Sequence, residues 1–447
     1  MKHFLIGSLL LTVAFAHAEG SPSFQRVVWP NGLTVLAVAD RSGAVAGLHL
    51  AARYDPAGLG PRRAGVAALS QQILQLQLSD MLHEDAWQEL GRQLRGTRAN
   101  LSANTETDYC EIRGKVTDEV LPQAVQLAGK LLLGHQPVKA EQLQYARDIL
   151  LAGRKDDRNA IIEGTYYCFL QALLGRRSPL AQPVQGSTET LKALTANDVA
   201  AFRATYMTPN NAVLTLIAPR APGDVADLAK LALGEYAAGP ATVPVQAATA
   251  APRSRVCVAQ QDGWRGVSLM VGVATPAYGT PDFFKAQLIY TLLEGKGGRL
   301  AEDAMLRAGL GVNHLAGRGQ EPPPVTVLPP MAQARPVLIL HMVMAPRQME
   351  LARQELLKHF LILQREPPTA AELDRAKRRL INSYARLRLD HANLSKALSC
   401  YELYGGDANL AWHAESRIEA VTGPDLVALA KQWFGSHAIG VLMPGDE

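Results

Sequence analysis

The chain divides near its middle at a stretch that favours neither helix nor strand. Residues 237–253 are mostly Ala, Pro and other small residues and carry no charge before Arg253, which is typical of a semi-extended linker. On both sides of it, apolar runs of strand type are mixed with longer helical stretches. A chain of 447 residues is also too long for one ordinary core. The sequence therefore predicts an α+β protein made of two similar halves.

Periodicity predicts the elements of each half. In the first half we expect strands at 27–38, 44–54, 107–116 and 212–218, and helices at 66–78, 85–94, 121–133, 141–152, 160–174 and 196–206. In the second half we expect strands at 266–273, 337–344 and 439–443, and helices at 282–293, 299–308, 349–365, 370–389 and 423–433.

The first eighteen residues have the pattern of a secretory signal peptide. A basic start at Lys2 and His3 precedes an apolar run at 4–15 that is short for a membrane span, and Ala16-His17-Ala18 is a small-x-small cleavage pattern. The residue directly after this site is Glu19 and not Cys, and no later apolar run is long enough to span a membrane. We therefore expect an exported, periplasmic or secreted protein without a stable membrane span. Its expected parts are a signal peptide (1–18), an N-terminal domain (19–236), the linker (237–253) and a C-terminal domain (254–447).

Charge and cysteine content exclude some classes of function. The net charge is only +4, from 45 basic and 41 acidic residues, and no basic cluster is long, so nucleic acid is not an expected partner. The four cysteines, Cys110, Cys168, Cys257 and Cys400, have no Cys-x-x-Cys spacing. In an oxidising compartment they are compatible both with one or two disulfides and with four buried thiols.

The order of motifs resembles that of the insulinase and pitrilysin zinc peptidases, which include the mitochondrial processing peptidase. The resemblance covers nearly the whole mature chain and rests on Trp29–Val35, Gly65–Leu74, Gly96–Ala103, Tyr206–Leu214, Gly297–Leu300, Gly309-Leu310 and Glu372–Lys377. It implies a processing-peptidase-like metallohydrolase fold, in which two homologous α/β-sandwich halves form a clamshell. Leu101 and Ala103 depart from the family's Gly-x-x-x-Asn-Ala-x-Thr segment.

The family's zinc site is lost from this sequence. An active relative carries His-x-x-Glu-His on one helix, where two His bind zinc and the Glu acts as general base. The corresponding positions here are Ala68, Gln71 and Gln72, and the third-ligand position aligns with Gly153. A methyl group cannot bind a metal, and neutral amides are weak ligands that take no proton from water. We expect no cofactor in this chain, no catalysis by it alone, and zinc only in a catalytic partner.

Other ionisable groups offer no replacement site. His49 lies in an apolar strand and is expected to be a hydrogen-bonded core histidine, and Ser70 lacks the Gly-x-Ser-x-Gly elbow of a serine hydrolase. The Arg and Tyr with which the second half of a non-catalytic relative helps to hold substrate align with Met305 and Val312, so this pair is lost too.

A route to peptide binding survives these losses. In the family, the strand that contains the Asn-Ala-x-Thr segment is an exposed edge that accepts a peptide through backbone hydrogen bonds, which require no particular side chain. The matching residues are Asn100, Leu101, Ser102, Ala103 and Asn104. The alternative is that Asn100 only caps or turns the chain and that this strand is covered by its own domain.

Two functions fit the sequence. The first is the non-catalytic subunit of an exported heteromeric zinc peptidase, which shapes the chamber and binds peptide or unfolded polypeptide beside a related catalytic subunit with an intact His-x-x-Glu-His. The alternative is a stand-alone peptide-binding or envelope scaffold protein without hydrolytic activity.

Overall fold

The fold is known from a computed structural model. It describes residues 24–445 except for 97–98, 154–156, 177, 241–242, 244–252, 295–297, 301–324 and 329–335. The helices are α1 (Pro56–Leu59), α2 (Val66–Met81), α3 (Gln88–Gly96), α4 (Leu121–Leu132), α5 (Ala140–Ala152), α6 (Asp157–Leu174), α7 (Thr188–Ala193), α8 (Ala196–Tyr206), α9 (Pro222–Leu233), α10 (Phe283–Leu293), α11 (Met349–Arg365), α12 (Ala370–Leu387), α13 (His391–Gly405), α14 (Asn409–Trp412), α15 (Ala414–Ala420) and α16 (Gly423–Trp433).

Two sheets form the framework. The first contains β1 (Phe24–Val28), β2 (Thr34–Ala39), β3 (Val45–Arg53), β4 (Asn100–Thr105), β5 (Tyr109–Thr117) and β6 (Ala212–Ala218), in the order β1-β2-β6-β3-β5-β4. The second contains β7 (Arg255–Gln261), β8 (Val267–Ala274), β9 (Val325–Leu328), β10 (Val337–Met344) and β11 (Ala438–Pro444), in the order β7-β11-β8-β10-β9. Each sheet has one parallel pair, β2 with β6 and β7 with β11, and is otherwise antiparallel. Mixed helix and sheet in two similar halves confirms the predicted α+β class.

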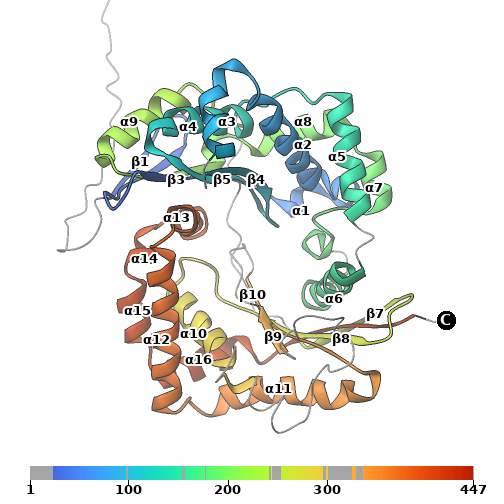
Figure 1. Cartoon of the computed structure of the whole chain (residues 1–447). Helices are drawn as coiled ribbons and strands as arrows, with labels where there is room; N and C mark the ends of the chain where they lie inside the picture. Colours follow the sequence, from blue (N-terminus) through green and yellow to red (C-terminus); the bar gives the residue numbers. More distant parts are fainter. Residues whose placement is uncertain are drawn as a thin grey trace, which may run out of the picture.

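The halves exchange one helix each. Helix α6 comes before the predicted linker, yet it packs on β7, β8 and β11 of the second sheet. Helix α13 comes late in the chain, yet it packs on β3, β5 and β6 of the first sheet. Figure 1 shows the two sheets facing each other, with α13 and α6 between them, α2 to α5 on the outer side of the first sheet and α11 on the outer side of the second. One core cluster accordingly contains Leu36 of the first sheet, Leu269 of the second and Leu398 of α13.

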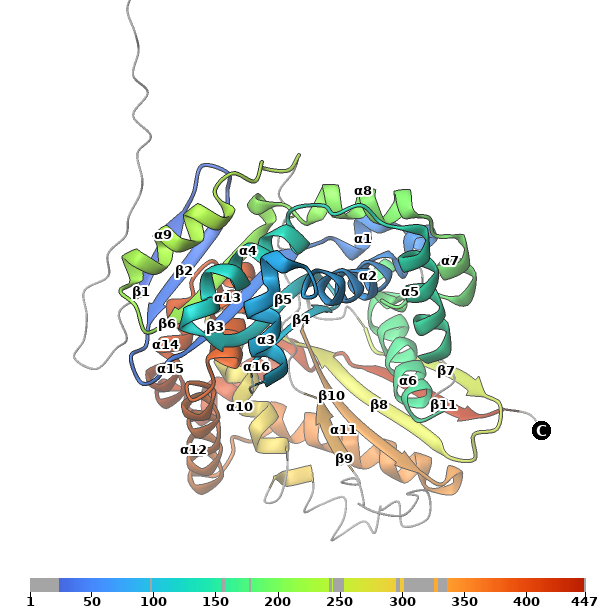
Figure 2. The ribbon, with the colours of Figure 1, turned by 45° about the horizontal axis from the view of Figure 1, so that its top comes forward.

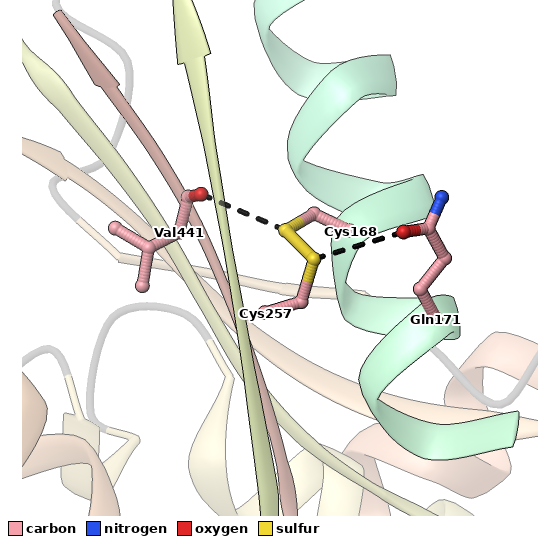
Figure 3. Close-up of a disulfide and its surroundings, with 4 residues drawn as sticks. All are labelled: Cys168, Gln171, Cys257 and Val441. Carbon is pink, nitrogen blue, oxygen red and sulfur yellow. Dashed lines mark hydrogen bonds between the residues drawn. A yellow bond between two sulfur atoms is a disulfide. The ribbon is translucent and has the colours of Figure 1, made fainter. Parts of the chain in front are cut away.

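A disulfide joins α6 to the second sheet. Cys168 of α6 and Cys257 of β7 are bonded, with Cα atoms 5.4 Å apart (Figure 3). Cys110 and Cys400 are free and buried, and burial raises the pKa of each thiol to about 12. The sequence left the pairing open, and the structure resolves it into one disulfide and two buried thiols.

Most predicted elements are present, with some differences. The strand expected at 27–38 is the hairpin β1–β2, because Gly32 takes a φ of 84° in the turn between them. Nearly all of the helix expected at 299–308 and most of the linker lie outside the described residues. Eight of these helices and strands were not predicted: α1, α7, α9, α13, α14, α15, β7 and β9. No helix among the described residues is long and apolar enough to cross a membrane.

Candidate functional site

Helix α2 carries the positions where an active relative has its zinc ligands. It starts after Gly65, whose φ of 95° and close approach to Gly186 leave no room for a side chain. Ala68 is buried in the core of the first half, whereas Gln71 and Gln72 are half-buried. The three positions therefore lie on a well-formed helix, but their groups can neither bind zinc firmly nor act as a base.

Two glutamine amides of α2 hold the neighbouring edge strand. The Nε2 of Gln75 donates to the backbone carbonyl oxygen of Ala103 in β4 at 2.6 Å, and the Nε2 of Gln71 donates to the same oxygen at 3.4 Å. Gln71 and Gln75 are four residues apart, so they lie on one face of α2. The position that would supply the general base thus contributes a contact with the sheet.

Strand β4 is an edge strand, and its outward groups can be assigned. It pairs only with β5 among the described residues, and the N–H of Glu106 donates to Tyr109 where the two strands meet. Because antiparallel pairs alternate, Leu101, Ala103 and Thr105 direct their N–H and C=O groups away from β5. The carbonyl of Ala103 that the glutamines hold is therefore one with which an added strand would pair.

The side chains of β4 that share a face with Ser102 are polar. The side chain of Asn100 accepts from the N–H of Lys115, and that of Asn104 donates to Ser102 Oγ and to Glu111 Oε1, both at 3.2 Å. Asn100 therefore ties β4 to β5, and β4 has no second neighbouring strand among the described residues. The position of β4 at the edge agrees with the expectation, and peptide binding there stays a prediction.

A buried charge cluster lies behind this edge. Glu111 and His49 are 0% exposed, and His49 Nε2 is 2.8 Å from Glu111 Oε2. Lys396 of α13 reaches Glu111 at 3.3 Å and Glu106 at 2.9 Å, and Arg113 also lies 3.3 Å from Glu111. His49 is a core histidine, as expected, although its Nδ1 has no hydrogen-bond partner.

The protonation states of this cluster follow from its contacts. Burial alone would raise the pKa of Glu111, but the hydrogen bond and charge of His49, with Lys396 and Arg113, hold it at about 2. Burial also lowers the pKa of His49. Glu111 is therefore an ionised carboxylate among cations, and the cluster is a structural network that joins α13 to the first sheet.

Ser70 has a structural partner and is not a nucleophile. Arg203 of α8, which is 1% exposed, donates through Nε to Ser70 Oγ at 3.0 Å, through Nη2 to the Ser70 carbonyl at 3.1 Å, and through Nη1 to Gln77 at 3.1 Å. Burial lowers the pKa of this guanidinium to about 10, so it remains charged near neutral pH. These contacts fasten α8 to α2.

The other expected positions add no site. Gly153 caps the C-terminal end of α5, is exposed and brings no carboxylate to α2. Met305 and Val312 lie outside the described residues. Within the described part of the chain, no group of three or more His, Cys, Asp or Glu could hold a metal ion.

Comparison with known proteins identifies the fold and a family that the chain resembles. Residues 193–380 match the family described as Peptidase M16 inactive domain. The match covers under half of the chain, so the chain is similar to M16 peptidases over that part. This confirms the resemblance to insulinase-type peptidases. The matched residues do not include α2. The chain is a non-catalytic M16-like protein.

Two further proteins are similar to this chain, one in sequence and one in structure. The human mitochondrial cytochrome b-c1 complex subunit 1 is 24% identical over 145 residues, which is 32% of this chain and 30% of that protein, so the match spans under a third of the relative. A protease from Helicobacter pylori has a similar structure, with a TM-score of 0.79 and 17% identity over 95% of this chain and 100% of that chain.

Two other solved structures share the fold. The peptidase M16 inactive domain from Pseudomonas fluorescens has a TM-score of 0.77 and 18% identity over 95% of this chain and 98% of that one. A chain of complex III2 from Candida albicans has a TM-score of 0.70 and 15% identity, covering 94% of this chain and 95% of that one. At these identities, the structural matches show the M16 fold alone.

Proposed function

We propose that this chain is the non-catalytic subunit of an exported heteromeric zinc peptidase, and that it presents peptide to a related chain with an intact His-x-x-Glu-His. The observation that carries the proposal is the state of α2 and β4. The ligand positions hold Ala68, Gln71 and Gln72, yet the edge strand beside them is kept in place by Gln71 and Gln75. An M16 frame that lacks zinc ligands but keeps its edge suits binding better than cleavage.

Two further observations support the partner and the compartment. The human relative is named as a subunit of the cytochrome b-c1 complex, and the Candida chain comes from complex III2, so M16-like chains occur within multi-subunit assemblies. The disulfide between Cys168 and Cys257 is of a kind that persists in oxidising compartments, which supports export to the periplasm or the medium.

The edge of β4 is partly occupied in the free chain. Gln71 and Gln75 already donate to the carbonyl of Ala103, so an added peptide strand has to displace them or leave that group aside. The remaining outward groups, on Leu101 and Thr105 and the N–H of Ala103, are still available for β-addition. Peptide binding by this chain is accordingly weak on its own and is completed by the catalytic partner.

Co-purification tests the subunit role. The native protein is isolated under mild conditions, and its partners, its zinc content and its peptide cleavage are measured. We expect a stoichiometric zinc-bearing M16 partner and a loss of cleavage when this chain is removed. A lone, metal-free protein that binds peptides without cutting them would favour the stand-alone scaffold, and one zinc with cleavage in the isolated chain would contradict the alignment of α2.

A pair of variants tests the edge. The Gln71→Ala/Gln75→Ala double variant frees the Ala103 carbonyl, and we expect it to bind an unstructured peptide about fivefold more tightly, as one regained hydrogen bond allows. Gln144→Ala on α5, whose amide bonds only within its own helix, is the matched control and should leave binding unchanged. Equal peptide affinity in all three proteins would remove β4 as the binding edge.

A further inference from the structure

Strand β7 is a second edge, at the far side of the second sheet. It is the last strand of that sheet and pairs only with β11 among the described residues (Figure 2). The N–H of Arg255 donates to His437 beside β11, so residues 255, 257 and 259 direct their backbone groups toward β11. In a parallel pair the alternate residues then direct theirs away. Val256, Val258 and Gln260 therefore offer backbone donors and acceptors at the rim of the sheet.

This edge lacks the usual protection against pairing. Natural edge strands carry charges, prolines or bulges that prevent the addition of another strand. From Val256 to Gln260 there is no charged residue and no proline, and β7 pairs with β11 residue for residue over its full length, without a bulge. The side chains of Val256 and Val258 are 63% and 52% exposed. By contrast, Gln71 and Gln75 cap the edge of β4.

The disulfide makes β7 a rigid edge. Cys257 lies between the two exposed valines and faces the opposite side of the sheet, where it is bonded to Cys168 of α6 (Figure 3). An edge strand with only one neighbouring strand would otherwise fray readily. A strand fixed before association loses little conformational entropy when it pairs.

We propose that β7 is a self-association edge, which pairs antiparallel with β7 of a second copy of this chain across a two-fold axis. A two-fold axis perpendicular to the sheet keeps the same face upward in both copies, so opposite residues must share a face. The register that places Val256 opposite Val258 of the second copy meets this condition and joins four exposed valines in one patch. Both residues of this pair have outward backbone groups, so they bond to each other directly.

Charge favours a second copy in this orientation. Arg253 and Arg255 lie at the start of β7 and Asp262 directly after its end, and none of the three takes part in an ion pair within the described part of the chain. Antiparallel pairing brings the basic end of one copy to the acidic end of the other. Parallel addition would instead align like charges.

The helices above the sheet leave room for this pairing. Helix α6 lies closest to β11, because a Cβ built on Gly440 would be 2.5 Å from the backbone nitrogen of Phe169. The two copies of β11 would be three strand spacings apart, roughly 14 Å. Helices pack at axial distances of about 8–10 Å, so the two α6 helices do not collide.

Self-association through β7 does not depend on the proposed function, since β7 and β4 belong to different sheets.

Sedimentation velocity of the purified chain over a range of concentrations tests the proposal. We expect a reversible monomer–dimer equilibrium. Val256→Lys and Val258→Lys, each of which places like charges together in the joined sheet, should weaken it by at least about tenfold. Leu231→Lys, at an 84% exposed position on α9, is the matched control and should leave it unchanged. Circular dichroism should show the same fold in all four proteins, because these side chains are exposed.

Hydrogen exchange locates the contact. At high concentration the amides of Val256 and Val258 should exchange slowly and become fast on dilution, whereas the amide of Cys257, which bonds to β11, stays slow at both. The proposal would be overturned by a chain that remains monomeric or by a dimer that Val258→Lys does not weaken. It would also be overturned if the exchange rates at Val256 and Val258 did not depend on protein concentration. Association with an unlike chain alone would overturn the second copy as the occupant.

Discussion

The two exchanged helices have the same structural task and are held by different chemistry. Helix α13 is fastened to the first sheet by charged groups along its length: Asp390 binds Lys115, Lys396 binds Glu106 and Glu111, and Glu402 binds Arg26. Helix α6 is fastened to the second sheet by a disulfide and by small polar groups, with Thr165 donating to Ser268 at 2.8 Å. One interface is ionic and the other is covalent and nearly neutral.

The difference follows from the inner faces of the sheets. The first sheet presents His49 and Glu111 to its helix, and a buried carboxylate requires an opposite charge nearby. The second sheet presents Gly272, Gly440 and Ser268, which let the helix backbone approach closely but give it little to bind. An exchanged helix can therefore be held by charge pairing, as α13 is, or by close backbone approach and a covalent bond, as α6 is.

The largest expected effect comes from removing the disulfide that holds α6. The Cys168→Ala/Cys257→Ala variant opens a link between residues 89 apart, and we expect the free energy of unfolding to fall by about 4 kcal/mol, because the unfolded chain regains the entropy of that loop. Denaturant unfolding measures it. A reductant should destabilise the natural chain to a similar extent and leave the variant unchanged. If the reductant had no effect on the natural chain, the disulfide would not be what holds α6.

The next effect tests whether both helices depend on close approach. A Cβ at Gly440 would lie 2.7 Å from the carbonyl oxygen of Thr165, and one at Gly47 would lie 2.6 Å from the carbonyl carbon of His391. Because these are backbone atoms, Gly440→Ala and Gly47→Ala should each lower the free energy of unfolding by about 3 kcal/mol.

Gly164→Ala on α6 is the control for these two variants. Its Cβ would meet only Leu442 at ordinary contact distance, and alanine is the better helix former, so this variant should be neutral or stabilising. If all three substitutions proved neutral, the helices would not sit as closely on the sheets as described. Thermal unfolding separates these outcomes.

Removing an ion pair between α13 and the first sheet should have a smaller effect on stability. Lys396→Met leaves Glu111 buried with one fewer cation, and because Lys396 is partly exposed we expect a loss of about 2 kcal/mol. Lys358→Met removes an exposed pair with Glu355 on α11 and should change stability by less than about 0.5 kcal/mol. Urea unfolding of both variants gives the comparison. Equal losses would mean that the cluster contributes no more than a surface pair.

The sequence predicted the order of elements well because most of them are amphipathic, and their apolar faces alternate with solvent-facing ones. It did not predict α13, whose two faces are both enclosed and whose buried positions include Ser395, Ser399 and Glu402, so the apolar periodicity is lost. Nor did it predict β7, an edge strand with exposed valines. The exchange of helices is set by tertiary packing and leaves no local signal.

The site was predicted in part. The loss of the zinc ligands at Ala68, Gln71 and Gln72 could be inferred from the motif alone. The contact of Gln71 and Gln75 with Ala103 could not, because it joins a helix to a strand about thirty residues away through an amide whose direction only the fold determines.

The smallest effect separates the two interfaces by pH. Burial lowers the pKa of His341 to about 4, and His341 contacts Ser268 at 3.0 Å, which in turn binds Thr165 of α6. Because the folded pKa lies below the unfolded value of 6.5, the stability that this neutral histidine contributes is complete above 6.5 and is lost as the pH falls toward 4. Glu111, with a folded pKa of about 2 against an ordinary 4.5, loses its contribution only below 4.5. Between about pH 7 and about pH 5.5 we therefore expect His341 to account for a loss of about 1 kcal/mol, which His341→Gln removes and Glu111→Gln retains. The loss from His49, whose pKa burial also lowers, remains in His341→Gln. Urea unfolding at a series of pH values measures how the free energy of unfolding of each variant changes with pH. If it changed equally in both variants over this range, His341 would not make the contact between α6 and the second sheet sensitive to pH.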